Sequence, residues 1–254
     1  MTFVLLFAAG LIGGMINSLA GGGSFIIFPA LMFAGVPPVL ANASNTYACL
    51  PGYVSGAAGY WKHIAPHRDR LLVYCVVGLI GGFLGAEALM RISDEQFAII
   101  IPWLMAFAVA IYVFGQRINR FVSARTNGSK RAARAGAIGL SVLLLAISFY
   151  GGFFNAGLGI VLLAWLALAG FEDVHAMNGL KLLLSTVISV VAVVRFAATG
   201  SIAWVEGSTA LAGAVVGGFA AAYFSPLVPA KVIRAFVIIY GVGLTLYFFW
   251  TVYG

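Results

Sequence analysis

Long apolar stretches separated by short polar interruptions run through the whole 254-residue chain. These stretches, for example residues 140–147 and 233–240, do not alternate between apolar and polar residues as the strands of a membrane β-barrel do. Because a helix needs about 20 apolar residues to cross a bilayer, the pattern predicts an all-α integral membrane protein, a polytopic helical bundle of roughly eight to ten segments. The expected segments are residues 3–20, 24–35, 40–60, 71–90, 97–115, 136–152, 157–170, 176–198, 205–223 and 231–251.

The composition supports a membrane protein and leaves no room for a soluble domain. Hydrophobic residues make up 63% of the chain, charged residues 8%, and the mean hydropathy is +1.07. Soluble domains carry about 25% charged residues. The net charge of +7 is not gathered on a soluble basic face, so we expect a lipid bilayer and no nucleic acid as partner. Cys49 and Cys75 lie in apolar segments and should be packing residues.

The long polar interruption at residues 116–134 carries six basic residues and no acidic residue. Basic residues accumulate in the cytoplasmic loops of membrane proteins, so this stretch predicts a cytoplasmic linker. The shorter interruption at residues 61–70 is also basic and should lie on the same side.

The linker divides the chain into two similar transmembrane repeats, residues 1–115 and 135–254. Three matches recur in the same order, about 136 positions apart. They pair residues 14–17 with 152–155, 41–46 with 176–181, and 78–83 with 213–219. Each repeat is expected to be a broken or re-entrant helix pair followed by three transmembrane helices. If that pair enters and leaves on one side, the repeats are inverted; if it crosses once, they are parallel. The loop charges favour inverted repeats.

The first repeat contains a glycine run that cannot continue a helix. Gly21, Gly22 and Gly23 each cost about 1 kcal/mol relative to Ala in a helix. At membrane depth an open backbone is tolerated only where protein buries it or a watery cavity meets it. With Ser24 at the N-cap position, the amides that follow would present the positive end of a half-helix to an anion. Residues 151–159 form the matching break in the second repeat.

Polar side chains form a stripe on the span that follows each break. Their spacings of three and four residues place them on one helix face. Lys181 lies six residues into its span with no acidic residue within four positions, so it either snorkels to the interface or neutralises an anion. We predict a substrate-binding site formed by Asn17, Gly21, Gly22, Gly23, Ser24, Asn42, Asn45, Thr46, Asn155, Gly157, Gly159, Asn178, Lys181 and Ser185.

Glu87 is the one acidic residue well inside a span. It can pair with Arg91 one turn later or serve as a proton-coupling group. Arg195, near the far end of its span, is expected to snorkel. The other glycines of the repeat motifs, at positions 78, 81, 82, 213, 217 and 218, should allow close packing between helices.

Catalytic and cofactor-binding motifs are missing from the sequence. It contains no His-Glu-x-x-His, no Gly-x-Ser-x-Gly and no nucleotide-binding P-loop. We therefore expect a protein that is not an enzyme and uses no cofactor and no metal. Transport across the membrane would be driven by a gradient or facilitated.

With these motifs in place, nearly the whole chain resembles the TauE/SafE family of membrane permeases, also called the toluene-sulfonate uptake permease family. The resemblance rests on residues 14–24, Pro29, 41–46, 51–52, 151–159 and 178–181. It implies a multi-pass transporter of the bacterial inner (plasma) membrane, made of two homologous halves, that moves sulfur-containing anions such as sulfite, sulfonates or sulfoacetate.

The sequence thus predicts a secondary membrane transporter, a permease or exporter, whose partner is a small anionic substrate. The alternative is a proton- or cation-coupled, channel-like permease for another small anion or solute. The direction of transport and a homo-oligomeric state stay open.

Overall fold

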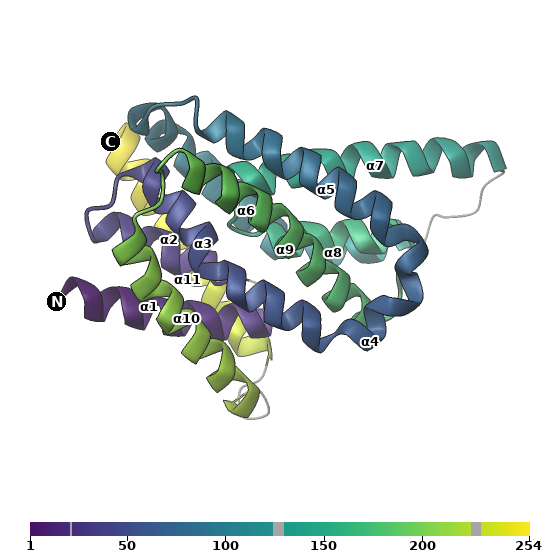
Figure 1. Cartoon of the computed structure of the whole chain (residues 1–254), viewed down its shortest axis with the longest axis horizontal. Coiled ribbons are helices and arrows are strands. Elements are labelled where there is room, and N and C mark those ends of the chain that lie inside the picture. Colours follow the sequence, from purple (N-terminus) through teal and green to yellow (C-terminus); the bar gives the residue numbers. More distant parts are fainter. Residues whose placement is uncertain (21, 124–129, 225–229) are drawn as a thin grey trace.

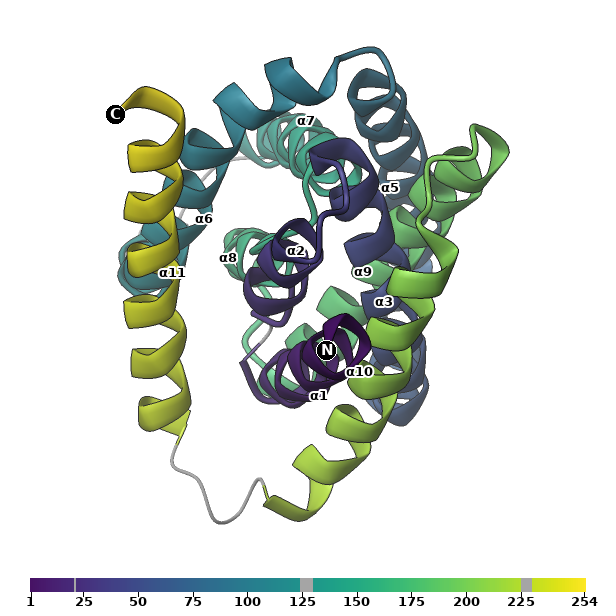
Figure 2. The ribbon, with the colours of Figure 1, turned by 90° about the vertical axis from the view of Figure 1, so that its left-hand side faces the viewer.

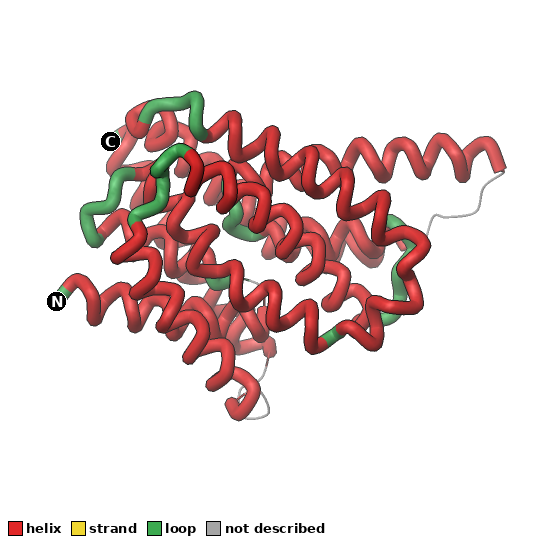
Figure 3. The backbone as a smooth tube through the Cα atoms, in the orientation of Figure 1, coloured by secondary structure: helices red, strands yellow, loops and turns green. Residues whose placement is uncertain are grey.

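The computed structural model describes residues 1–20, 22–123, 130–224 and 230–254, which fold into a helical bundle (Figures 1 and 3). No strand occurs in this described part of the chain, so the all-α prediction is confirmed. Each of the ten apolar segments expected from the sequence is one of the longer helices. In order the helices are α1 (Thr2–Ala20), α2 (Ser24–Phe33), α3 (Pro38–Gly59), α4 (Trp61–Ile64), the 3₁₀ helix η1 (Ala65–His67), α5 (Arg68–Leu89), α6 (Asp94–Ser123), α7 (Lys130–Phe153), α8 (Leu158–Leu168), α9 (Val174–Ala198), α10 (Trp204–Phe224) and α11 (Ala230–Tyr253).

The two basic interruptions are more helical than expected. Residues 61–70 contain α4, η1 and the start of α5 instead of a loop. In the predicted linker 116–134, α6 continues to Ser123 and α7 already begins at Lys130, while residues 124–129 lie outside the described residues. The physical reason is that Lys and Arg are good helix formers, so a helix can continue beyond its apolar part.

Four helical stretches of the described chain are long and apolar enough to cross a membrane. They span Trp61–Leu89, Asp94–Ile111, Val174–Ala198 and Ala235–Tyr253. Further apolar helices of 10–17 residues include those of the two broken pairs. By length α3 could also span, but its Asn, Ser and Thr residues lower its hydropathy, so fewer than the eight to ten expected segments meet the criterion of length and composition.

Glycines bring the two halves of the chain into close contact. A methyl group on Gly10, Gly14, Gly213 or Gly217 would overlap the backbone of the partner helix in the α1–α10 pair. Gly81, Gly85 and Gly152 play the same part between α5 and α7. The predicted packing role is therefore confirmed for Gly81, Gly213 and Gly217, and for Gly82, which lies against α9. A methyl on Gly78 or Gly218 would meet only ordinary van der Waals neighbours.

The contacts also fix the directions of the helices. On α3 and α9, Gly56 lies against Leu182 whereas Ser44 accepts a hydrogen bond from the residue 203 amide just beyond α9, so the two helices are antiparallel. α1 runs parallel to α10, and α5 runs parallel to both α7 and α9. The matching helices α3 and α9 thus run in opposite directions, as the prediction of inverted repeats requires. The repeat relation itself stays a prediction.

The short helices α2 and α8 occupy the middle of the bundle, as the end-on view shows (Figure 2). Every residue from Ser24 to Leu31 is buried. Phe28 of α2 meets the rings of Phe97 from α6 and Phe154 from the α7–α8 connection, at centroid distances of 6.4 and 5.5 Å. Edge-to-face contacts of this kind stabilise packing beyond area burial. The half-helix α2 is therefore enclosed by protein along most of its length.

The α5–α7 contact predicts a stability difference between two glycine substitutions. Gly85→Ala should lower the melting temperature in detergent, because its methyl group would overlap the Phe149 carbonyl and overpacking costs about 1–3 kcal/mol. Gly139→Ala on α7 is the matched control, since it points into open space and gains the same helix propensity. Equal melting temperatures for the two variants would contradict the close-packing role of Gly85.

Candidate functional site

The first break lies between α1 and α2 and is three residues long. Gly21 lies outside the described residues, Gly22 is buried, and a methyl group on Gly23 would overlap the Gly13 carbonyl of α1. Gly23, not Ser24, is the N-cap of α2, so the predicted N-cap was wrong by one residue. Because Ser24 already belongs to the helix, its hydroxyl is directed to a neighbouring helix instead of the amides of its own first turn.

The second break is shorter than predicted and covers residues 154–157, because Gly151 and Gly152 still belong to α7. Gly157 has a φ of +79°, a left-handed conformation that glycine adopts without strain. Gly159 is buried in the first turn of α8. The freed carbonyls find donors in the protein: Tyr150 donates to Ala156 O at 2.6 Å. This is what an interrupted helix at membrane depth needs.

Asn42 and Thr46, both predicted site residues, support the second break. The Asn42 amide nitrogen donates to the Phe153 carbonyl, at the end of α7, at 2.8 Å. Thr46 donates to the Asn42 carbonyl one turn earlier on α3, at 3.0 Å. These bonds tie α3 of the first half to the interrupted helix of the second half, which is a positioning role.

A line of buried polar side chains runs between the two breaks. The Ser24 hydroxyl lies 3.5 Å from the Cys49 sulfur, which in turn lies 3.8 Å from Asn45 Oδ1. The Tyr53 side chain interacts with Ser24 and Cys49 on one side. On the other side its hydroxyl donates to Asn155 Oδ1 at 3.0 Å.

The line continues from Asn155 into α9. The Asn155 amide nitrogen donates to the Ser189 hydroxyl at 3.1 Å. Both residues are buried, as are Ser24, Asn45 and Cys49. Buried polar groups are costly unless they are hydrogen-bonded, so such a continuous series through an apolar bundle indicates a functional requirement.

A cavity of about 380 Å³ adjoins the first break. Its walls come from α1, α3 and α10, with Leu182 of α9 and Ile27 of α2 completing them. The cavity extends from Cys49, on the polar line, to Tyr60, directly before α4. Its lining residues are uncharged, and its polar groups are supplied by Asn17, Ser18, Cys49, Ser55 and Tyr60.

Of the predicted substrate-binding residues, Asn17 lines this cavity. Ser24 and Asn45 lie behind its wall, each in contact with Cys49. Asn178, Lys181 and Ser185 lie elsewhere on α9 and do not line it. Polar side chains of α3 and α9 thus connect the two breaks. Lys181 does not line the open cavity.

Lys181 is a buried cation with little local compensation. Only 7% of the residue is exposed, and its ammonium donates to Asn178 Oδ1 at 3.3 Å. Among the described residues no carboxylate forms an ion pair with it. The hydroxyl of Ser185, one turn along, is buried without a hydrogen-bond partner in the described structure. The Lys181 ammonium and the Ser185 hydroxyl can therefore still donate hydrogen bonds, and such donors suit an anion.

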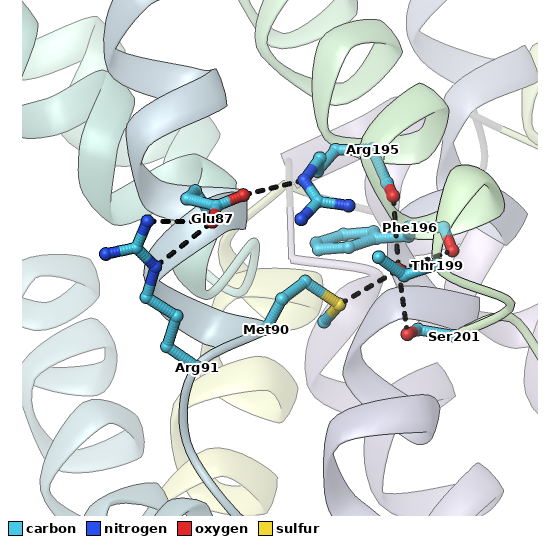
Figure 4. A network of polar contacts seen from close by, with 7 residues as sticks. All are labelled: Glu87, Met90, Arg91, Arg195, Phe196, Thr199 and Ser201. Atoms are coloured by element: carbon cyan, nitrogen blue, oxygen red, sulfur yellow. Dashed lines mark hydrogen bonds and ion pairs between the residues drawn. The ribbon is translucent and has the colours of Figure 1, made fainter.

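Glu87 lies in a different network, near the C-terminal end of α9, with Arg91 and Arg195 beside it (Figure 4). Its carboxylate accepts from Arg195 of α9 at 2.7 Å and from Arg91 at 3.0 Å. The expected i,i+4 pair with Arg91 is therefore present, but Arg195 forms an ion pair across the halves, so the prediction that it snorkels was wrong. Glu87 lines neither the cavity at Asn17 nor the one between α2, α6 and α11.

Sequence reasoning missed Tyr53 and assigned Cys49 to packing. A signal was available for Tyr53: it follows Cys49 by four residues, on the same face as Asn42, Asn45 and Cys49. It was overlooked because a tyrosine in an apolar span resembles ordinary packing. Ser189 follows Ser185 by four residues on the same face of α9, but its hydrogen bond to Asn155 depends on tertiary structure.

Curated relatives of this chain are named as membrane transporters. A probable membrane transporter protein, ORF9, from Sinorhizobium sp is 27% identical over 95% of this chain and 90% of its own length. One from Haemophilus influenzae is 25% identical over 95% of this chain and 92% of its own length. The probable membrane transporter protein YfcA of Escherichia coli K12 is 26% identical over 84% of this chain and 77% of its own length. No solved structure gives a significant match.

The family model described as "Sulfite exporter TauE/SafE" matches residues 6–248, nearly the whole chain. Together with the apolar helices and the two interrupted helix pairs, this match shows what kind of protein the chain is. It is a multi-pass membrane protein that belongs to the TauE/SafE family of membrane transporters.

Proposed function

We propose that the protein is a secondary transporter, a permease or exporter, that carries small sulfur-containing anions such as sulfite, sulfonates or sulfoacetate across the bacterial inner membrane. The observation that carries this proposal is the cavity at Asn17 and Cys49, which connects to a buried polar line between two interrupted helices. Interrupted helices at the interface between repeats are a recurring way to build a midplane substrate site.

The size of the cavity supports a small substrate. Ligand pockets have volumes of about 300–1,000 Å³, and this cavity is near the lower limit. The uncharged donors Asn17, Ser18, Ser55 and Tyr60 can replace part of the hydration shell of an oxyanion. An anion that moves deeper would approach the polar line, and Lys181, next to the cavity-lining Leu182 at the Tyr60 end of α9, is the buried cation that would balance its charge on entry.

One end of the cavity reaches Tyr60, on the side predicted to be cytoplasmic. Tyr60 lines it and directly precedes α4, which carries Lys62. By the positive-inside rule this basic segment faces the cytoplasm. We therefore take the cavity as the cytoplasmic entrance of a multi-pass transporter in the inner membrane.

The cavity assignment predicts a loss of transport in Asn17→Leu and Gly52→Leu. Both substitutions place an apolar side chain in the cavity, and loss of one hydrogen bond to a charged ligand should weaken binding about tenfold or more. Sulfite flux into proteoliposomes measures the effect. Ser148→Ala is the control, because Ser148 is buried but does not line the cavity. Wild-type flux in both leucine variants would remove the cavity from the transport path.

Lys181 predicts a separate, charge-dependent effect. Lys181→Met keeps most of the side-chain volume but removes the charge, so the apparent affinity for the anion should fall at least about tenfold while the protein still folds. Lys62→Met, an exposed lysine on α4, is the matched control. If flux in Lys181→Met retains the wild-type concentration dependence, Lys181 does not balance the charge of the substrate.

No contact of the described chain favours the alternative of a proton-coupled, channel-like permease. The Glu87 carboxylate forms ion pairs with Arg91 and Arg195. We therefore expect Glu87→Gln to lower thermal stability and to leave the pH dependence of flux unchanged. Flux at a series of pH values, with melting temperature recorded in parallel, measures both effects. A loss of pH dependence in Glu87→Gln at normal stability would instead favour the alternative.

A further inference from the structure

Two equivalent asparagines, one in each half of the chain, have opposite surroundings. Asn17 and Asn155 end the matching Gly-x-x-Asn motifs of the two repeats. Asn17 faces the open cavity and has no hydrogen-bond partner among the residues that the structure describes. Asn155 is 1% exposed and bonds through both its side-chain atoms, to Tyr53 and to Ser189.

The two partners of Asn155 are themselves equivalent. Tyr53 of α3 and Ser189 of α9 are about 136 positions apart, the spacing of the repeat. If the two halves exchanged conformations, Tyr53 and Ser189 would therefore bond Asn17 instead of Asn155. Asn17 is within reach of such an exchange, because a Cβ on Gly52, the neighbour of Tyr53, would lie 3.7 Å from its amide nitrogen.

The matching place in the second half holds a packed side chain instead of a cavity. Where the first half has Gly52 beside the cavity, the second half has Ile188. Ile188 is fully buried, and its side chain would lie 3.2 Å from a methyl group on Gly151. The helices around it, α5 and α9, are held together by the Glu87–Arg195 ion pair, at 2.7 Å, across the two halves.

The open cavity has no such closure. In the first half the helices equivalent to α5 and α9 are α10 and α3. They touch near Ser44 and Gly207, but farther along they line the cavity with Ala214 and Gly52. The two halves therefore differ in one respect: one helix pair is separated beside its asparagine, and the other is closed over its asparagine.

We propose that the Asn155 cluster is the closed half of an alternating gate, and that Asn155 is a second substrate contact on the opposite side of the membrane. In the other state, Tyr53 and Ser189 leave Asn155 and bond Asn17. The present cavity then closes, α5 parts from α9, and a counterpart cavity opens at Asn155. The anion would meet one asparagine from each side. This inference rests on the proposed transport function.

Thiol labelling at two matched positions tests the gate. In a Cys49→Ser, Cys75→Ala background, Ser55→Cys reports the open cavity, and Val191→Cys, about 136 positions later, reports its closed counterpart. The purified protein in detergent is treated with a small water-soluble methanethiosulfonate. We expect fast labelling at position 55 and slow labelling at position 191.

Removing the bonds that hold the closed half should reverse this difference in part. Tyr53→Phe loses one bond in each state, so it should leave both labelling rates near their starting values. Asn155→Ala loses bonds of the present state only, so it should raise the labelling rate at 191 about fivefold and slightly lower the rate at 55. Asn17→Ala should do neither, because its bonds form only in the other state. Ser148→Ala is the control for a buried polar loss elsewhere.

Unchanged labelling at 191 in Asn155→Ala, or the same shift in Asn17→Ala, would overturn the gate. The assay needs no substrate, so it separates the gate from the substrate assignment. If labelling shifts as expected while no sulfur anion is carried, the gate stands and the proposed substrate falls.

Discussion

The backbone of an interrupted helix needs hydrogen-bond partners that lipid cannot supply, and this need organises the whole molecule. Both interruptions therefore lie inside the protein, with α2 and α8 in the middle of the bundle. Their free groups are met by neighbours: Tyr150 donates to the Ala156 carbonyl, and Asn42 donates to the Phe153 carbonyl. Some polar residues that resemble binding-site residues therefore serve to hydrogen-bond the interrupted backbone.

Enclosing the breaks requires helices that approach closely, which explains the many glycines. Between α1 and α10, and again between α5 and α7, a methyl group would overlap the backbone opposite. Each of these pairs joins one half of the chain to the other. The same contacts that build the interface between the halves also leave the cavity beside Asn17, where Gly52 presents no side chain.

The helices were predictable from the sequence because apolar runs and glycine breaks are local signals. Residues 61–70 and the ends of 116–134 were misjudged, since charge marks the membrane boundary but does not end a helix. The site was only partly predictable. Asn17 lines the cavity, but Lys181 does not, because helical spacing gives the face of α9 and not what that face meets. Tyr53 became visible only through its bond to Asn155 across α3 and the second break.

The central claim is that a small sulfur oxyanion binds beside the broken helices, at Asn17. Anion-dependent thermal stability of the detergent-solubilised protein tests it most directly, because a ligand that binds only the folded state raises the melting temperature increasingly as its concentration exceeds its dissociation constant. Sulfite, thiosulfate, sulfate and small sulfonates are compared with chloride, in wild type and in Asn17→Leu. The account predicts a concentration-dependent rise with at least one sulfur anion that Asn17→Leu abolishes. A melting temperature that no sulfur anion raises above the chloride value, or a rise that Asn17→Leu retains in full, would contradict it.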